Sequence, residues 1–212
     1  MEHVSITFIE MVCDISSAST RKDMRELNSH WGSYPNTLSA EEKTYELLLV
    51  PKLENDQPVL CYYLCKMDDA LVPLDCLEHN WNAPYNSIEH VATINPQDYL
   101  KLKKVDTQQK INVLKKALCG SRRPYMFTNE LDSSDSADLH TILEGLSGLT
   151  EIRIHAELPY LQKVFEREMQ SPYLKTVKTK VEMPQKEYIS ENFDNATDLP
   201  KGYKGVYTRK LK

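Results

Sequence analysis

The apolar residues between positions 139 and 181 switch repeatedly between helical spacing and strand spacing. Leu139, Ile142, Leu143 and Leu146 recur at helical intervals, and Gly148 follows where a helix is expected to stop. Residues 149–154 then alternate with a period of two, which is typical of a half-buried strand. The same helix and strand patterns return over residues 158–169 and 174–179. This stretch therefore predicts helix, strand, helix, strand.

The two predicted strands belong to a longer series of similar units. Ile152 and Val177 lie 25 residues apart, a period typical of leucine-rich repeats. The same step backwards reaches Phe127, and a slightly longer step forwards reaches Val206. Four stacked units predict an α/β (α+β) fold: a parallel sheet covered by helices on one side. The alternative is an ordinary α/β or α+β sheet in which this spacing is a coincidence.

The N-terminal residues 4–31 show the pattern of two short amphipathic helices. Ser5 is placed to cap the first helix, and a capping box at residues 20–23 predicts the start of the second. The apolar residues of these helices are Phe8, Ile9, Val12 and Cys13, then Met24, Leu27 and Trp31. Two such helices bury too little apolar surface to fold alone. We therefore expect them to dock on the remaining chain or on a partner.

The middle of the chain predicts a capping box, a hairpin and two helices. Residues 39–42, Ser-Ala-Glu-Glu, predict a helix start. Residues 45–50 and 59–66 are β-rich and flank a polar loop bounded by Pro51 and Pro58. Asn95-Pro96 and Thr107 predict the starts of two helices, the second ending at Gly120. The predicted organisation is a helical module (residues 1–40) and an α/β domain with the hairpin and the repeat-like units (residues 41–212).

The bulk composition narrows the classes of protein. The chain is 41% hydrophobic and 27% charged, with a net charge of −5, so it favours neither nucleic acid nor membrane as a partner. An acidic residue stands near the N-terminus, where a signal peptide needs basic charge. Five cysteines at irregular spacing fit reduced thiols. We expect a cytoplasmic or nuclear protein.

Candidate chemistry is sparse. Cys61, Cys65, Cys76 and His79 offer four zinc ligands, but on a strand Cys61 and Cys65 are about 13 Å apart. Cysteines among Val, Leu and Tyr residues are more often small buried side chains. Residues 145–149, Gly-Leu-Ser-Gly-Leu, lack the spacing of a nucleophile elbow. The carboxylates of the helix around Glu166 and Glu168 are expected to face solvent. We therefore expect no metal, no cofactor and no enzyme activity.

Both ends of the chain resemble the F-box-like proteins that nematodes carry in large numbers. The N-terminal residues Val4, Phe8-Ile-Glu, Val12-Cys and Leu27-x-x-x-Trp31-Gly resemble their degenerate F-box, with Trp31 at the position of its hallmark tryptophan. Residues 164–174 resemble the helix-to-strand phrase of their C-terminal repeats. Val4-Ser5 stands where the F-box usually has Leu-Pro. The resemblance implies N-terminal helices that dock on the Skp-type adaptor of a cullin–RING ubiquitin ligase, and a C-terminal part that captures a protein target.

The sequence thus predicts a non-enzymatic interaction protein that recruits substrates to a ubiquitin ligase. The partner-binding residues we expect are those on the apolar face of the N-terminal helices: Phe8, Val12, Met24, Leu27 and Trp31. The alternative for the same residues is packing against the hairpin. The alternative function is that of a stand-alone binding or inhibitor protein, of the antidote type, that has lost the ligase link. A small zinc module or an enzyme is a third class.

Overall fold

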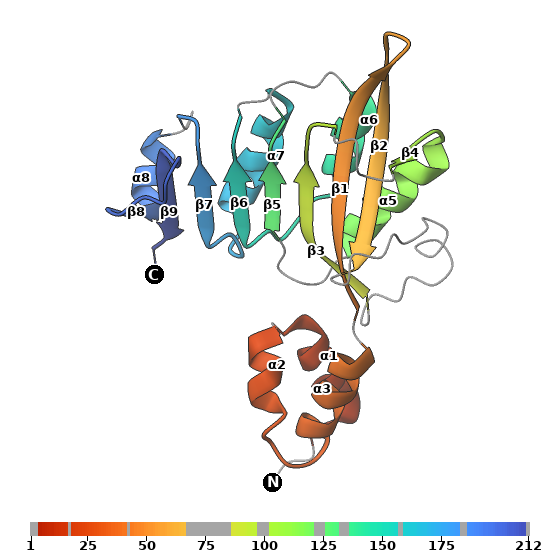
Figure 1. Cartoon of the computed structure of the whole chain (residues 1–212). Helices are drawn as coiled ribbons and strands as arrows, with labels where there is room; N and C mark the ends of the chain where they lie inside the picture. Colours follow the sequence, from red (N-terminus) through yellow and green to blue (C-terminus); the bar gives the residue numbers. More distant parts are fainter. Residues whose placement is uncertain are drawn as a thin grey trace.

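The chain forms a helical module followed by an α/β domain (Figure 1). The computed structural model describes residues 4–16, 18–41, 43–66, 86–96, 102–120, 126–131, 136–156, 159–182 and 186–210. The module contains α1 (Ile6–Ile15), α2 (Ala18–Met24) and α3 (His30–Glu41). Every described strand follows it in the sequence. None of the helices in the described ranges is long and apolar enough to cross a membrane.

One mixed sheet organises the α/β domain. Its nine described strands have the order β4-β2-β1-β3-β5-β6-β7-β9-β8. The inner strands β1, β3, β5, β6 and β7 are parallel, and the pairs towards both edges are antiparallel. The strands are β1 (Lys43–Glu54), β2 (Gln57–Lys66), β3 (Asn86–Thr93), β4 (Lys103–Lys104), β5 (Met126–Asn129), β6 (Glu151–Ile154), β7 (Thr176–Thr179), β8 (Phe193–Asn195) and β9 (Gly205–Arg209).

Three neighbouring strands confirm the predicted 25-residue step. Phe127 of β5 pairs with Ile152 of β6, and Ile152 pairs with Val177 of β7. The fourth predicted unit does not continue the parallel series. Val206 lies in β9, which runs antiparallel to β7 and pairs through Tyr207 with Val177. The prediction of a parallel fourth strand was wrong because β8 and β9 form a closing antiparallel pair instead.

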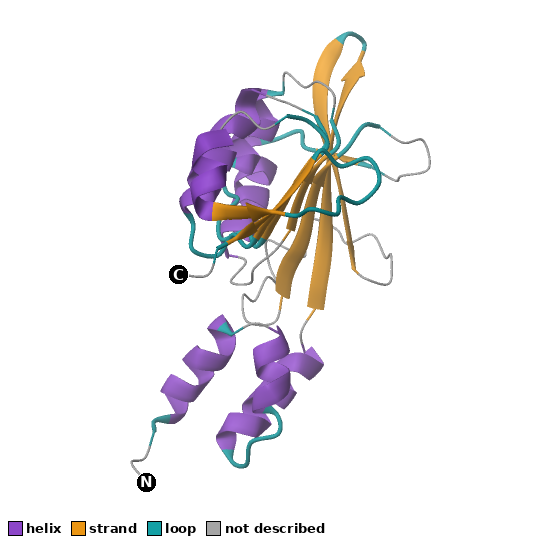
Figure 2. Ribbon diagram, turned by 90° about the vertical axis from the view of Figure 1, so that its left-hand side faces the viewer, coloured by secondary structure: helices purple, strands orange, loops and turns teal. Residues whose placement is uncertain are grey.

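The helices of the α/β domain cover one face of the sheet, as predicted (Figure 2). They are α5 (Gln108–Gly120), α6 (Ala137–Leu143), α7 (Pro159–Gln170) and α8 (Lys186–Asn192). Phe127, Ile152, Ile154 and Val177 all point into a single apolar core with residues of these helices. Fully burying one such side chain contributes roughly 1.5–3 kcal/mol to stability. The opposite face of the sheet carries the alternate side chains, and we call it the open face because no described helix covers it. Around β1–β3 this face still has a small buried cluster of its own, formed by Val50, Cys61, Ala92 and Ile94.

Local capping signals set several of the boundaries. Thr107 Oγ1 accepts a hydrogen bond from the backbone N–H of Lys110, which confirms the predicted start of α5. Ser136 caps α6 in the same way through the N–H of Leu139. α6 ends at Leu143, so Gly148 is not its C-cap as predicted. Gly148 instead takes a φ of 72° in the turn before β6.

The hairpin formed by β1 and β2 is longer than predicted. Its turn is only Asn55-Asp56, with φ values of 51° and 60°, so the predicted loop between the two prolines is wrong. Pro51 and Pro58 instead lie within the strands. The strands tolerate them because β1 pairs with β3 only as far as Leu49, which leaves one side of the ribbon free. The hairpin consequently projects beyond the rest of the sheet (Figure 1).

The N-terminal module departs from the prediction in its second half. α2 begins at Ala18, before the predicted capping box at Thr20, and ends at Met24. A turn then places Leu27 outside any helix and Trp31 in α3. The predicted capping box at Ser39 is also wrong, because Ser39 lies in the last turn of α3. The helix predicted from Asn95-Pro96 lies outside the described residues.

Candidate functional site

The buried residues of the N-terminal module define which side chains remain for a partner. Ile9 and Cys13 of α1 and Leu38 of α3 are buried. The Sγ atom of Cys13 lies 3.8 Å from Sδ of Met24, which ties α1 to the end of α2. Arg21 of α2 is also buried, at 2% exposure. This small core uses only one narrow side of α1.

The turn between α2 and α3 brings Leu27 towards the start of α3. Ser29 takes a φ of 77°, which reverses the chain. The N–H of Gly32 donates to the carbonyl of Ser29, and a Cβ added at Gly32 would lie 2.0 Å from the carbonyl oxygen of Leu27. Only glycine fits this contact. The Trp31-Gly32 pair therefore positions Leu27 as well as the tryptophan.

Large apolar side chains are exposed around this module. Phe8 and Leu27 are each 52% exposed, and the ring of Phe8 meets that of Trp31 edge-on at a centroid distance of 6.5 Å. Val12, Met24 and Trp31 are half-buried. We call these five predicted residues, together with Ile6 and Met11, the N-terminal apolar surface. The surface is drawn from α1, the end of α2, the turn and α3 rather than from two helices.

Sequence reasoning missed Ile6 and Met11, which are 59% and 61% exposed. Their signal was present in the sequence. α1 carries apolar residues on nearly every side, and a helix of that kind cannot bury them all in a module of this size. Clustered exposed apolar side chains are typical of interaction sites. One polar pair borders them: Nε2 of His30 lies 3.4 Å from Oε1 of Glu10.

A second group of side chains crosses the open face from β1 to β5. Glu46 Oε1 lies 2.5 Å from Nδ1 of His90, and Nε2 of His90 lies 2.9 Å from Oγ1 of Thr128. The hydrogen bond from His90 lowers the pKa of Glu46 and outweighs the opposite effect of burial. The order carboxylate, imidazole, hydroxyl is that of a catalytic triad. Thr128 could act as the nucleophile of such a triad only where its surroundings allow that chemistry.

The surroundings of Thr128 do not suit that chemistry. Its side chain is only 4% exposed. β5 is paired with β3 on one side and β6 on the other, so its backbone N–H groups are engaged in the sheet and are not aimed at a tetrahedral intermediate. The three side chains instead link β1, β3 and β5 through hydrogen bonds.

A third group lies at the carboxyl ends of the parallel strands, where open α/β sheets commonly bind ligands. His155 follows β6, and Lys180 follows β7. Lys180 Nζ lies 3.5 Å from Nδ1 of His155 and 5.7 Å from the ring centroid of Tyr203. Glu130, which follows β5, lies 3.6 Å from the same imidazole nitrogen. Burial and the charge of Lys180 lower the pKa of His155, which keeps the ring neutral.

Beneath this group, Asn129 is a buried residue that the sequence did not predict as important. Its side-chain amide donates to the carbonyls of Leu131 and Ala156, and its oxygen accepts from Thr93 Oγ1 at 2.6 Å. The amide thus joins the ends of β3, β5 and β6. Glu168 was predicted to face solvent, but it is 2% exposed and accepts from the N–H of Leu149. That prediction was wrong because the turn before β6 needs an acceptor.

The predicted metal ligands are only partly described. Cys61 and Cys65 are both buried in β2, and burial raises the pKa of the Cys61 thiol, which disfavours the thiolate. Cys76 and His79 lie outside the described residues. Among the residues that the structure describes, no group of three or more His, Cys, Asp or Glu side chains converges as metal ligands.

Of the three groups, the N-terminal apolar surface is the one that exposes large apolar side chains, which do not stabilise an isolated folded chain. The Glu46 group is internally hydrogen-bonded, whereas Phe8, Met11 and Leu27 expose apolar area. Comparison with known proteins adds nothing to this geometry: no family model, no curated protein and no solved structure matches the chain. The functional assignment of this chain therefore rests on its own residues.

Proposed function

We propose that the protein is a non-enzymatic interaction protein, an F-box-like subunit that recruits a target to a cullin–RING ubiquitin ligase. Its N-terminal apolar surface binds a Skp-type adaptor, and its α/β domain binds the target. It acts in the cytosol or nucleus, where cysteines stay reduced.

The observation that carries the proposal is the exposure of Phe8, Met11 and Leu27 on a module with its own small core. Binding energy at interfaces is concentrated in a few large side chains, and tryptophan is among the most enriched. Trp31 belongs to this group, and the ring of Phe8 lies edge-on against its ring. Half of the area of Phe8 and Leu27 is still available for burial by a partner.

The direct test is the affinity for a purified Skp-type adaptor, measured by isothermal titration calorimetry. The double variant Phe8→Ala/Leu27→Ala should lose about 2–4 kcal/mol of binding free energy, roughly 30- to 1000-fold in Kd. Its thermal unfolding should stay close to that of the wild type, because neither side chain belongs to a buried core.

The matched control variant truncates two exposed apolar side chains of the α/β domain instead. Leu53 at the hairpin and Tyr173 after α7 are 73% and 60% exposed. The variant Leu53→Ala/Tyr173→Ala should bind the adaptor within about twofold of the wild type. Failure of the wild type to bind any Skp-type adaptor would reject the proposal in favour of a stand-alone binding protein. Equal loss in both double variants would place the adaptor surface elsewhere.

A further inference from the structure

The open face of β6 and β7 carries a compact group of charged side chains. Arg153 Nε and Lys178 Nζ both donate to Oε1 of Glu151, at 2.6 and 2.8 Å. Burial alone raises the pKa of this carboxyl, but the two cations outweigh it and lower the pKa. Two cations thus share one carboxylate, so one positive charge is left uncompensated.

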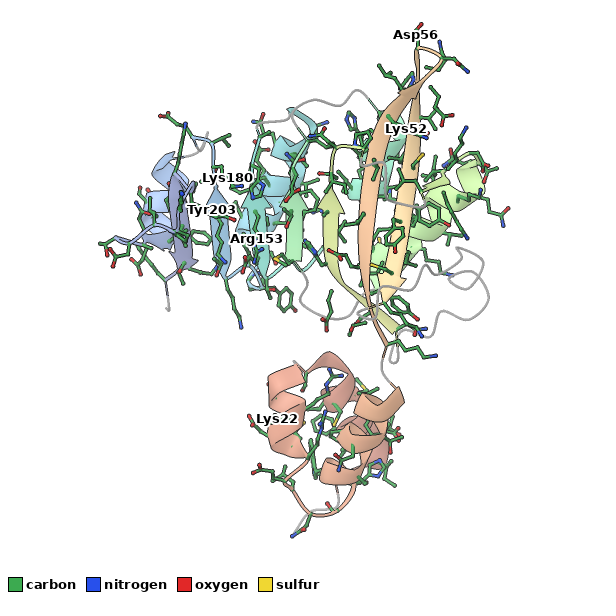
Figure 3. The ribbon with its side chains drawn as sticks, in the orientation of Figure 1. Lys22, Lys52, Asp56, Arg153, Lys180 and Tyr203 are labelled. Atoms are coloured by element: carbon green, nitrogen blue, oxygen red, sulfur yellow. The ribbon has the colours of Figure 1, made fainter. Side chains whose placement is uncertain are left out.

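This group continues to the carboxyl ends of the same strands. Lys180 follows Lys178 by two residues and therefore points to the same face of β7. Tyr203 lies beside Lys180 and meets the ring of His155 edge-on at 6.0 Å. Figure 3 shows Arg153, Lys180 and Tyr203 close together on the side of the sheet away from the helices. We call Arg153, His155, Lys178, Lys180 and Tyr203 the open-face basic patch.

The charge of this patch is positive, whereas the net charge of the whole chain is negative. The chain has a net charge of −5, yet its last 42 residues, 171–212, contain nine basic and five acidic residues. Parallel strands are usually covered on both faces, whereas the described helices of the α/β domain cover one face of the sheet (Figure 2). A basic, aromatic-containing surface on an acidic protein complements a negatively charged partner.

We propose that the open-face basic patch binds an acidic, extended segment of a protein. This inference rests on the proposed function, because the segment belongs to the target that the α/β domain captures. Residues at alternate positions of a strand lie roughly 6.6 Å apart. Lys178 and Lys180 have that spacing, so acidic side chains at alternate positions of a segment lying along β7 can pair with them.

The residues around the patch favour single carboxylates. A phosphate group carries about −1.5 to −2 charge and is usually held by several arginines. Here Arg153 is already bonded to Glu151, and Glu130 lies 3.6 Å from His155. Nε2 of His155 is buried and has no hydrogen-bond partner among the described residues. Beside this ring, the exposed Lys180 can pair with a single carboxylate.

The acids in and around the patch also disfavour nucleic acid. Glu151 and Glu130 lie among the cations, and only three cations face the same side of these strands. Nucleic-acid surfaces neutralise many phosphates in a row. An acidic protein segment needs fewer cations and pairs with them one at a time.

The test uses the full-length protein and a fluorescent synthetic peptide of about eight residues in which Glu and Thr alternate. A Gln-Thr peptide of equal length is the uncharged comparison. We expect saturable binding of the Glu-Thr peptide by fluorescence anisotropy, at least tenfold tighter than the Gln-Thr peptide, and weakened by added salt. The triple variant Arg153→Gln/Lys178→Gln/Lys180→Gln should weaken this binding roughly tenfold or more.

The control variant removes three positive charges from positions outside the open-face basic patch. Lys22, Lys116 and Lys163 are exposed on α2, α5 and α7, and their replacement by Gln should change peptide binding less than about twofold. Equal losses in both triple variants, or tighter binding of a single-stranded oligonucleotide than of the Glu-Thr peptide, would overturn the proposal. Adaptor affinity is measured separately. If it is absent while the peptide result holds, the ligase function fails and the acidic-segment site stands.

Discussion

At the scale of single residues, buried polar side chains decide how the strands are joined. Glu46, His90 and Thr128 link three strands across the open face, and Asn129 links three strand ends. Each of these groups has at least one partner far away in the sequence. A buried polar atom without such a partner costs about 1–3 kcal/mol. Apolar packing alone would tolerate several registers of strand pairing, and these contacts therefore select one of them.

Glu46 makes stability depend on pH in a defined direction. Because the pKa of the folded carboxyl is lower than its ordinary value of 4.5, its contribution is present above that value and is lost as the pH falls through the folded pKa. We expect the melting temperature of the wild type to fall between about pH 5 and pH 3, and that of Glu46→Gln to fall less. Differential scanning calorimetry over this range measures the difference.

The control for this experiment is Glu26→Gln, because Glu26 is exposed on the turn after α2. That variant should follow the pH dependence of the wild type. If Glu46→Gln follows it equally well, the hydrogen bond to His90 does not stabilise the fold.

At the scale of elements, the prediction succeeded where a pattern is local or strictly periodic. The Thr107 cap, α7 and the step from Phe127 to Ile152 and Val177 follow from spacing alone. It failed where the backbone of one segment meets another. No periodicity reveals the close contact between Gly32 and the carbonyl of Leu27, or that a third helix containing Trp31 begins at His30. The N-terminal apolar surface was thus predicted by residue type, but its arrangement was not.

Two substitutions in the hairpin turn should change the stability of the protein in opposite directions. Asp56 holds a φ of 60°, which glycine adopts freely and a β-branched residue strongly resists. Asp56→Gly should stabilise the protein by about 0.5 kcal/mol, and Asp56→Val should destabilise it by about 1 kcal/mol. Urea denaturation measures both. Equal effects of the two substitutions would mean that the turn is not of the two-residue type with positive φ.

At the scale of the whole molecule, the three N-terminal helices and the α/β domain have separate interiors. The apolar clusters of the α/β domain contain no residue before Tyr45, whereas the module buries Ile9, Cys13 and Leu38. The two parts share no buried apolar cluster among the described residues. Domains built in this way unfold in separate steps.

Leu38→Asp should therefore melt the N-terminal helices and leave the sheet folded. A buried charge in so small a core costs several kcal/mol, more than the module is expected to withstand. Hydrogen exchange with mass spectrometry should show loss of protection over α1–α3 and unchanged protection in β5–β7. The neighbouring exposed substitution Thr37→Asp should alter neither region. Loss of protection throughout the chain would show that the two parts fold as one unit.

Strands β5, β6 and β7 pair at equivalent residues, and this regular pairing determines how such a chain can gain further strands. Because each strand follows the previous one by the same 25 residues, duplication of one such segment would add a strand and a helix without disturbing the neighbouring register. The antiparallel β9 stops this growth at its C-terminal end, since it pairs with the last parallel strand in the opposite direction. The closing pair of strands acts as the terminus of an extensible series, and it keeps the edge of β7 from recruiting another chain.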